Sequence, residues 1–177
     1  MDCFKKLGLA PGNAISYSGF REGQQPGGSY PSYEEVKEDL LILQKNWKYL
    51  RLYDCDRHGE TVLKVIQQEN LDFKIMMGAY IEAELNNFGC PWGGGVYSEE
   101  QLALNQHNNL KKIEKLIELG NTYPEIIFSL SVGNEACVDW TDHYVSVNQV
   151  IEYTNMVRKA AGQPVTFCEN YVPWLNK

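Results

Sequence analysis

The sequence lacks the features of several protein classes. Its 177 residues contain 16 lysines and arginines against 23 aspartates and glutamates, a net charge of −7, so no basic stripe is available for the phosphates of a nucleic acid. No apolar run approaches the roughly 20 residues that span a bilayer. The first residues, Met1 to Gly8, have no apolar core of a secretory signal. We therefore expect no nucleic-acid partner, no membrane partner and a cytoplasmic location.

Cysteine pairs and metal-binding spacings are also missing. The five cysteines stand at positions 3, 55, 90, 137 and 168 without any Cys-x-x-Cys, so neither a disulfide framework nor a zinc knuckle is indicated. Reduced thiols are the simplest interpretation. The rival hypothesis is a metal- or thiol-dependent site, which would combine Cys55, His58, Cys137, His143 and Cys168.

Loops that hold nucleotides or nucleophilic serines are absent as well. The glycine-rich run Gly93 to Gly95 lacks the spacing of a dinucleotide fingerprint and the lysine of a P-loop. No Gly-x-Ser-x-Gly occurs. We expect no cofactor and no metal.

What the sequence does contain is a regular alternation of strand and helix patterns. Short β-rich segments are expected at 14–20, 49–53, 73–80, 126–132 and 164–168. Amphipathic helices are expected between them, at 32–47, 60–69, 98–119 and 146–161. Three of these helices open with a serine that is followed three residues later by Glu or Gln. Because parallel neighbours need a crossover, this order predicts a parallel sheet.

Two architectures fit such a sheet: an open doubly wound sheet, or part of a closed (β/α)8 barrel. The predicted strands start on average under 40 residues apart, so eight units would need about 300 residues, within the barrel range. We predict an α/β fold, an incomplete parallel TIM-type barrel with about four βα units and a fifth strand, as one partial domain over 1–177. No helix is expected after the fifth strand, which Pro173-Trp174 interrupts, so the chain is expected to be truncated there.

Polar and aromatic side chains gather where the predicted strands end. In either architecture, functional groups collect at the carboxyl ends of the strands. Those ends carry Tyr17, Arg51, Tyr53, Asp54, Tyr80, Glu82, Asn134, Glu135, Trp140, Glu169 and Trp174. Aromatic faces can stack on a pyranose while amides and carboxylates bind its hydroxyls, so the set is suited to a sugar.

The pair Asn134-Glu135, which follows an apolar strand, has the clearest chemical meaning. Glycoside hydrolysis uses one carboxylic acid to protonate the leaving oxygen and a second carboxylate to attack the sugar or activate water. An amide beside the acid can hold the sugar 2-hydroxyl. The alternative is an ordinary polar strand exit, because asparagine is common in turns.

Four segments of the chain resemble glycoside hydrolase family 17, and more closely its bacterial β-1,3-glucanase and glucanosyltransferase branch. They are Arg51-Leu52-Tyr53-Asp54, Lys74-Ile75-Met76-Met77-Gly78, Val132-Gly133-Asn134-Glu135 and Pro164-Val165-Thr166. The resemblance implies a retaining enzyme on a (β/α)8 barrel that acts on a β-1,3-glucan without a cofactor. It implies that Glu135 is the general acid/base with Asn134 beside it. Tyr17, Arg51, Tyr53 and Asp54 would then shape the glucan site.

The resemblance leaves the second carboxylate unassigned. The family's nucleophile is a glutamate at the end of strand seven, whereas this sequence reaches strand five, so Glu169 is implied to line the site and bind substrate. Tyr80, Glu82, Trp140 and Trp174 are expected to bind substrate too. Two hypotheses follow: part of a retaining glucan hydrolase without its nucleophile half, or a non-catalytic protein that binds sugar or completes a barrel. Unpaired barrel edges predict self-association.

Overall fold

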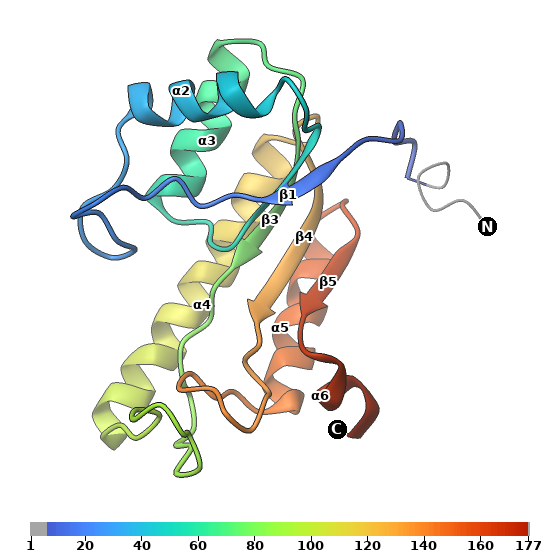
Figure 1. The fold of residues 1–177 in the computed structure, drawn as a ribbon. Helices are drawn as coiled ribbons and strands as arrows, with labels where there is room; N and C mark the ends of the chain where they lie inside the picture. The colour runs from blue at the N-terminus through green and yellow to red at the C-terminus, as the bar shows by residue number, and fades with distance from the viewer. Residues whose placement is uncertain (1–6, 177) are drawn as a thin grey trace.

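The computed structural model describes residues 7–176, so Cys3 and most of the segment Met1 to Gly8, where no secretory signal is expected, lie outside the described residues. Strands and helices alternate along these residues (Figure 1). In chain order they are β1 (Ala14–Ser16), α2 (Tyr33–Leu43), β2 (Tyr49–Leu52), α3 (Arg57–Gln68), β3 (Lys74–Ala79), α4 (Glu99–Thr122), β4 (Ile127–Asn134), α5 (Val147–Ala160), β5 (Val165–Cys168) and α6 (Tyr171–Asn176). None of the described helices is long and apolar enough to cross a membrane.

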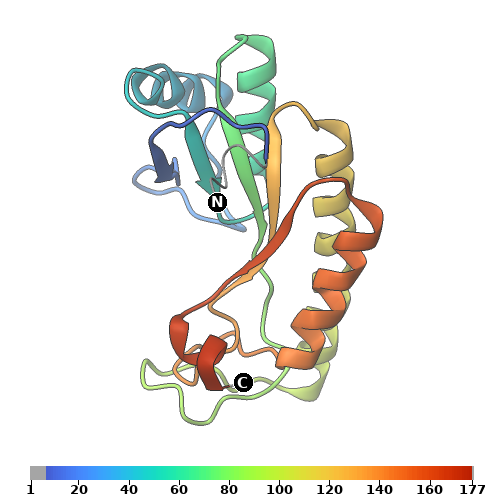
Figure 2. The same cartoon turned by 90° about the vertical axis from the view of Figure 1, so that its right-hand side faces the viewer.

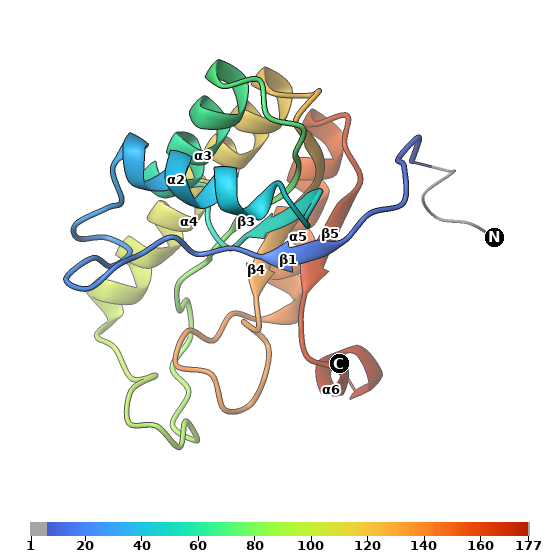
Figure 3. The same ribbon diagram turned by 45° about the horizontal axis from the view of Figure 1, so that its top comes forward.

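The five strands form one parallel sheet in the order β1-β2-β3-β4-β5. The four longer helices, α2 to α5, lie together on one side of this sheet (Figure 3). A doubly wound sheet has helices on both faces and reverses its strand order at a switch point. The sequential order and the one-sided helices are those of a TIM-type barrel, so the predicted α/β fold, part of such a barrel, is confirmed.

Alternation along the strands decides which side chains face the helices. On β2, Leu50 and Leu52 are buried in the core that the helices cover, whereas Arg51 between them is only partly buried. On β3, Ile75 and Met77 are fully buried and pack in the same core. Because successive side chains of a strand point to opposite faces, Arg51 points to the concave side, away from the helices.

Helix starts follow the predicted caps. Ser32, Ser98 and Ser146 cap α2, α4 and α5, and Ser32 forms a full capping box with Glu35. The third predicted helix begins earlier than expected. Asp56 accepts hydrogen bonds from the N–H groups at the start of α3, so that helix starts at Arg57 rather than near residue 60.

The expectation that no helix follows the fifth strand was wrong. The six-residue helix α6 begins three residues after β5, and Pro173 is its third residue. Proline is tolerated there because N–H groups of the first turn have no partner within the helix. Trp174 therefore lies on a short helix rather than in a loop, where its ring packs near Phe167 at 6.1 Å between centroids.

The predicted end of the long helix was also wrong. The helix was expected to end at residue 119, directly before Gly120-Asn121, but α4 continues to Thr122. A Cβ on Gly120 would lie 3.1 Å from a methyl group of Leu130 on β4, so this glycine serves the close approach of helix and sheet.

Candidate active site

A side-chain hydrogen bond joins the ends of β2 and β4 across the end of β3. Arg51 Nη2 donates to Asn134 Oδ1 at 2.5 Å. A guanidinium has only donors, so the amide oxygen of Asn134 must face it and the amide nitrogen is left to donate elsewhere. Arg51 also lies over the ring of Tyr53 at 4.6 Å, and that ring is exposed. The structure thus brings together three of the predicted site residues.

Glu135 follows Asn134 in a turn of uncommon backbone geometry. Its φ is 49°, a left-handed value that among the described residues other than glycine only Asn70 shares. The turn begins at Gly133, with φ of 77°, where a Cβ would lie 3.1 Å from both Ile81 and Phe167. The side chain of Glu135 is exposed, and its carboxylate makes no hydrogen bond to another residue within 7–176. Such strained positions cluster at active sites.

His143 on the loop after β4 holds the backbone of this turn. Its Nε2 lies 2.9 Å from the carbonyl oxygen of Asn134, and because a carbonyl only accepts, that nitrogen carries the proton. The other ring nitrogen contacts the Tyr80 hydroxyl at 3.0 Å and Asp142 at 2.8 Å. Burial raises the pKa of Tyr80 to about 12, so its hydroxyl stays protonated at neutral pH. From the sequence, His143 is expected only as a possible metal ligand, and this contact was not predicted.

Glu169 fixes the same loop from β5. Its two carboxylate oxygens accept the backbone N–H groups of Cys137 and Asn170, both at 2.7 Å. Burial raises the pKa of Glu169, and the nearby charge of Glu135 raises it further. The two glutamates therefore lie at the same edge of the sheet, but one is held by hydrogen bonds and the other is free to meet a ligand. A substrate-binding role for Glu169 stays a prediction.

Asp54 is part of a buried ion pair. Its Oδ2 accepts from Lys112 Nζ on α4 at 2.9 Å, and its Oδ1 accepts the N–H groups of Cys55 and Tyr80. Lys112 also donates to the Tyr80 carbonyl at 2.7 Å. Burial raises the pKa of Asp54, an effect that the lysine partly offsets. Lys112 lies within a helix and belongs to no motif, so its role could not be predicted from the sequence.

The other predicted site residues differ in whether their side chains are already hydrogen-bonded within the protein or exposed to a ligand. The Tyr17 hydroxyl donates to Asp39 at 2.8 Å, and burial together with this carboxylate raises the pKa of Tyr17. Glu82 and Trp140 have exposed side chains, although the backbone of Glu82 is held by Asn109. Tyr17 therefore supports the wall of the site through a bond within the protein, whereas Glu82 and Trp140 can reach a ligand.

A cavity of about 560 Å³ opens at the carboxyl ends of β1 to β3. Aromatic and charged side chains line it, among them Tyr17, Phe20, Tyr30, Tyr53, Asp54, Asp56, His58, Tyr80, Glu82 and Lys112. Tyr53 contacts Arg51 and Tyr80 contacts His143, so the cavity borders the turn at Glu135. Phe20 ends the first expected strand and Tyr30 lies in the loop after it, but neither was predicted as a site residue. Apolar rings with a few polar groups are typical of ligand sites.

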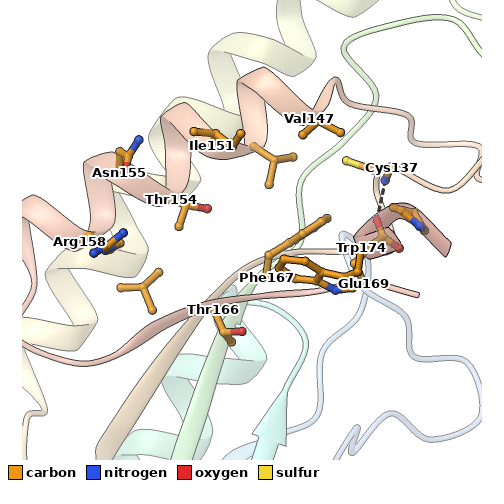
Figure 4. A pocket seen from close by; sticks show the side chains of 13 residues that line it. Cys137, Val147, Ile151, Thr154, Asn155, Arg158, Thr166, Phe167, Glu169 and Trp174 are labelled. Carbon is orange, nitrogen blue, oxygen red and sulfur yellow. Dashed lines mark hydrogen bonds between the residues drawn. The ribbon is translucent and has the colours of Figure 1, made fainter. Parts of the chain in front are cut away.

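A second cavity, of about 410 Å³, lies between α5, β5 and α6 (Figure 4). Its lining is mainly apolar and includes Val150, Ile151, Val165, Phe167 and Trp174, with Glu169 at one side. In a (β/α) barrel, the outer ring of helices covers this outward face of the strand. Neither cavity is lined by Asn134 or Glu135. The first opens at the carboxyl ends of the strands and borders that turn through Tyr53 and Tyr80, whereas the second lies on the outward face, so we regard the first as the candidate sugar site. The predicted role of Trp174 gains no support from its position.

The structure does not assemble the rival metal site. Cys55 and Cys137 donate to backbone carbonyls, and Cys168 accepts from Ser131. His58 accepts the N–H of Gly19. Across the described residues, no three potential ligands lie close enough together to hold a metal ion.

Known structures share this architecture. An endo-laminarinase from Formosa Hel1_33_131 is 27% identical with a TM-score of 0.69, over 92% of this chain and 43% of that chain. The chain has a glycoside hydrolase fold. It spans less than half of that laminarinase. A β-glucuronidase (GUS) from Parabacteroides merdae, 13% identical with a TM-score of 0.54 over 88% of this chain and 17% of that one, is similar in fold alone. No family model and no curated protein sequence match the chain.

Proposed function

We propose that this chain provides the acid/base side of a retaining glycoside hydrolase that cleaves β-1,3-glucan, with Glu135 as the general acid/base. The observation that carries the proposal is the Arg51–Asn134 bond beside a free, exposed carboxylate in a left-handed turn. The similarity to an endo-laminarinase supports a glucan as the substrate.

The geometry assigns a task to each group. Glu135 protonates the glycosidic oxygen as the bond breaks and then takes a proton from the attacking water. The Asn134 amide nitrogen, which Arg51 leaves unengaged, donates to the sugar 2-hydroxyl, a bond that strengthens in the transition state. The cavity at the ends of β1 to β3 holds the neighbouring sugar units against its aromatic walls.

The nucleophile is proposed to come from outside the five strands. Retention requires two carboxyl groups about 5–5.5 Å apart on opposite sides of the sugar carbon. Glu169 shares an edge with Glu135, but both of its oxygens already bind backbone N–H groups. The resemblance to family 17 implies a nucleophile on strand seven. A second candidate function, binding of glucan without cleavage, is favoured by this engagement of Glu169.

The test compares Glu135→Gln with the unchanged protein, as its source cell makes it, on a linear β-1,3-glucan. Removing a general acid costs about 10²- to 10⁴-fold in rate, so the release of reducing ends should fall by that factor. With an aryl glucoside that has a good leaving group, Glu135→Gln should lower the rate of glycosidic bond cleavage less, because the departing phenolate needs no proton. Glu125→Gln, at the opposite end of β4, is the matched control.

The outcomes separate the two functions. Saturable glucan binding without turnover by the unchanged protein would support the binding function and contradict hydrolysis. Equal turnover in Glu135→Gln and the control would remove Glu135 from the acid/base role.

A further inference from the structure

Two loops at the carboxyl edge of the sheet lie side by side, residues 86–97 after β3 and residues 135–146 after β4 (Figures 1 and 2). The Asn87 side chain donates to the carbonyls of Asp139 and Thr141 at 2.8 and 2.7 Å. The Tyr97 hydroxyl donates to the carbonyl of Asp142 at 2.9 Å. These bonds fasten the paired loops, as we call residues 86–97 and 135–146, into one surface.

The first of the paired loops is also braced internally. Asn87 N–H donates to the carbonyl of Gly95 at 2.6 Å, and Tyr97 N–H donates to the Asn86 side chain at 2.7 Å. Between these bonds the chain turns through Gly93, Gly94 and Gly95, all with positive φ, which other residues rarely adopt. The tip is therefore a closed loop of defined shape, like other compact loops whose ends meet.

These fixed loops expose large aromatic side chains. Phe88 is 82% exposed, Trp92 is 77% exposed and Trp140 is 38% exposed. Val96 and Leu85 are exposed beside them in sequence. Several large apolar side chains that are exposed to solvent on loops held in place by hydrogen bonds are typical of a binding site.

We propose that Phe88, Trp92 and Trp140 form an aromatic platform that binds further glucose units of a β-glucan chain beyond the central site. The proposal rests on the glucan hydrolase function. Trp140 lies on the loop that begins at Glu135, and Asn87 binds the carbonyls on either side of Trp140, so both loops adjoin the candidate acid/base and would carry a glucan chain away from it.

The charges of the paired loops disfavour an anionic ligand. Neither loop contains a lysine or arginine, while Glu135, Asp139 and Asp142 are acidic. Phosphates of a nucleic acid or an anionic lipid surface would be repelled. A glucan chain carries no charge, stacks its C–H faces on aromatic rings and offers hydroxyls to carboxylates. Aromatic side chains also lose little conformational entropy when they bind.

The test measures affinity against chain length. Titration calorimetry of the unchanged protein with β-1,3-linked glucose disaccharide and hexasaccharide should show tighter binding of the hexasaccharide, because only the longer chain reaches the platform. In Phe88→Ala/Trp92→Ala the hexasaccharide affinity should fall about tenfold, equal to about 1.4 kcal/mol. The disaccharide affinity should not change. Ile42→Ala, on the exposed face of α2, is the control for removing a surface hydrophobic side chain.

The outcomes distinguish the platform from the function on which it rests. If the unchanged protein prefers the longer sugar and the double variant keeps that preference, the platform is overturned and the hydrolase function stands. If neither sugar binds the unchanged protein, both are overturned. If the double variant keeps its affinity but dissociates from dimer to monomer in sedimentation, the surface is a contact between protein copies and the platform is overturned.

Discussion

Replacing Lys112 by methionine tests how the structure supports the site. Methionine preserves most of the length of the side chain and removes its charge. The change leaves Asp54 Oδ2 and the Tyr80 carbonyl without the donor that ties both strand ends to α4. We expect a large loss of stability, because the carboxylate stays behind in a mostly buried position.

The size of the loss follows from burial and from the remaining bonds. The side chains of Lys112 and Asp54 are 23% and 19% exposed. Removing one partner of a buried pair costs about 3–5 kcal/mol. Asp54 keeps two backbone donors on Oδ1 and some contact with water, so the free energy of unfolding should fall by about 3 kcal/mol, at the lower end of that range.

The loss should depend on pH. Lys112 lowers the pKa of Asp54 and burial raises it, so in Lys112→Met the folded-state pKa rises further above 3.8, the ordinary value. Between pH 3.8 and this raised pKa, the folded variant binds more protons than its unfolded chain. The free energy of unfolding of the variant therefore falls as the pH rises through that range. The penalty should be full at neutral pH and should shrink as the solution is acidified.

The assay is urea unfolding followed by circular dichroism at about pH 7 and about pH 5. Asp54→Asn/Lys112→Met is the informative control, because the asparagine oxygen still accepts both backbone N–H groups and carries no charge. The double variant should lose only about 1 kcal/mol, with little pH dependence. A loss below about 1 kcal/mol in Lys112→Met that does not change with pH would refute the reasoning, since such values are typical of exposed pairs.

Three other predictions concern acid stability, the site and the sheet edges. Burial lowers the pKa of His58 from 6.5 to about 4, so about 3 kcal/mol of stability should be lost as pH falls across that window, and His58→Gln should abolish this dependence in urea titrations. Arg51→Met should lower kcat/KM on β-1,3-glucan about 100-fold with an unchanged unfolding midpoint, because Asn134 loses the bond that orients its amide. The control Arg57→Met, at an exposed arginine, should leave kcat/KM unchanged. Within residues 7–176, β1 and β5 each pair on one side, so sedimentation should show association that grows with concentration, and a monomer at all concentrations would contradict it.

Much of the fold follows from short-range signals in the sequence. The serine caps, the periodicity of the helices and the β-rich segments act within a few residues, and they predicted the order of five strands and four long helices. The errors arise where one residue type has two structural uses. Gly120 resembles a helix stop but provides space for Leu130, and Pro173 resembles a strand breaker but lies in the first turn of α6.

The partners of the candidate site could not be predicted in this way. Arg51 meets Asn134 across 83 positions, Asp54 meets Lys112 across 58 and Tyr17 meets Asp39 across 22. No periodicity or spacing encodes such pairs. They arise because parallel strands bring their carboxyl ends to one edge and helices deliver side chains to it from the outside.

Residue types alone were enough to predict that carboxylates, amides and aromatic rings follow the strands, with Asn134-Glu135 at the end of the fourth strand. Which of these groups bind other parts of the protein depends on how the chain folds. Glu169 binds backbone N–H groups, whereas the Glu135 carboxylate makes no hydrogen bond within the described chain. The physical reason is that a residue's type is local, but its hydrogen-bond partners and its exposure depend on every element packed around it.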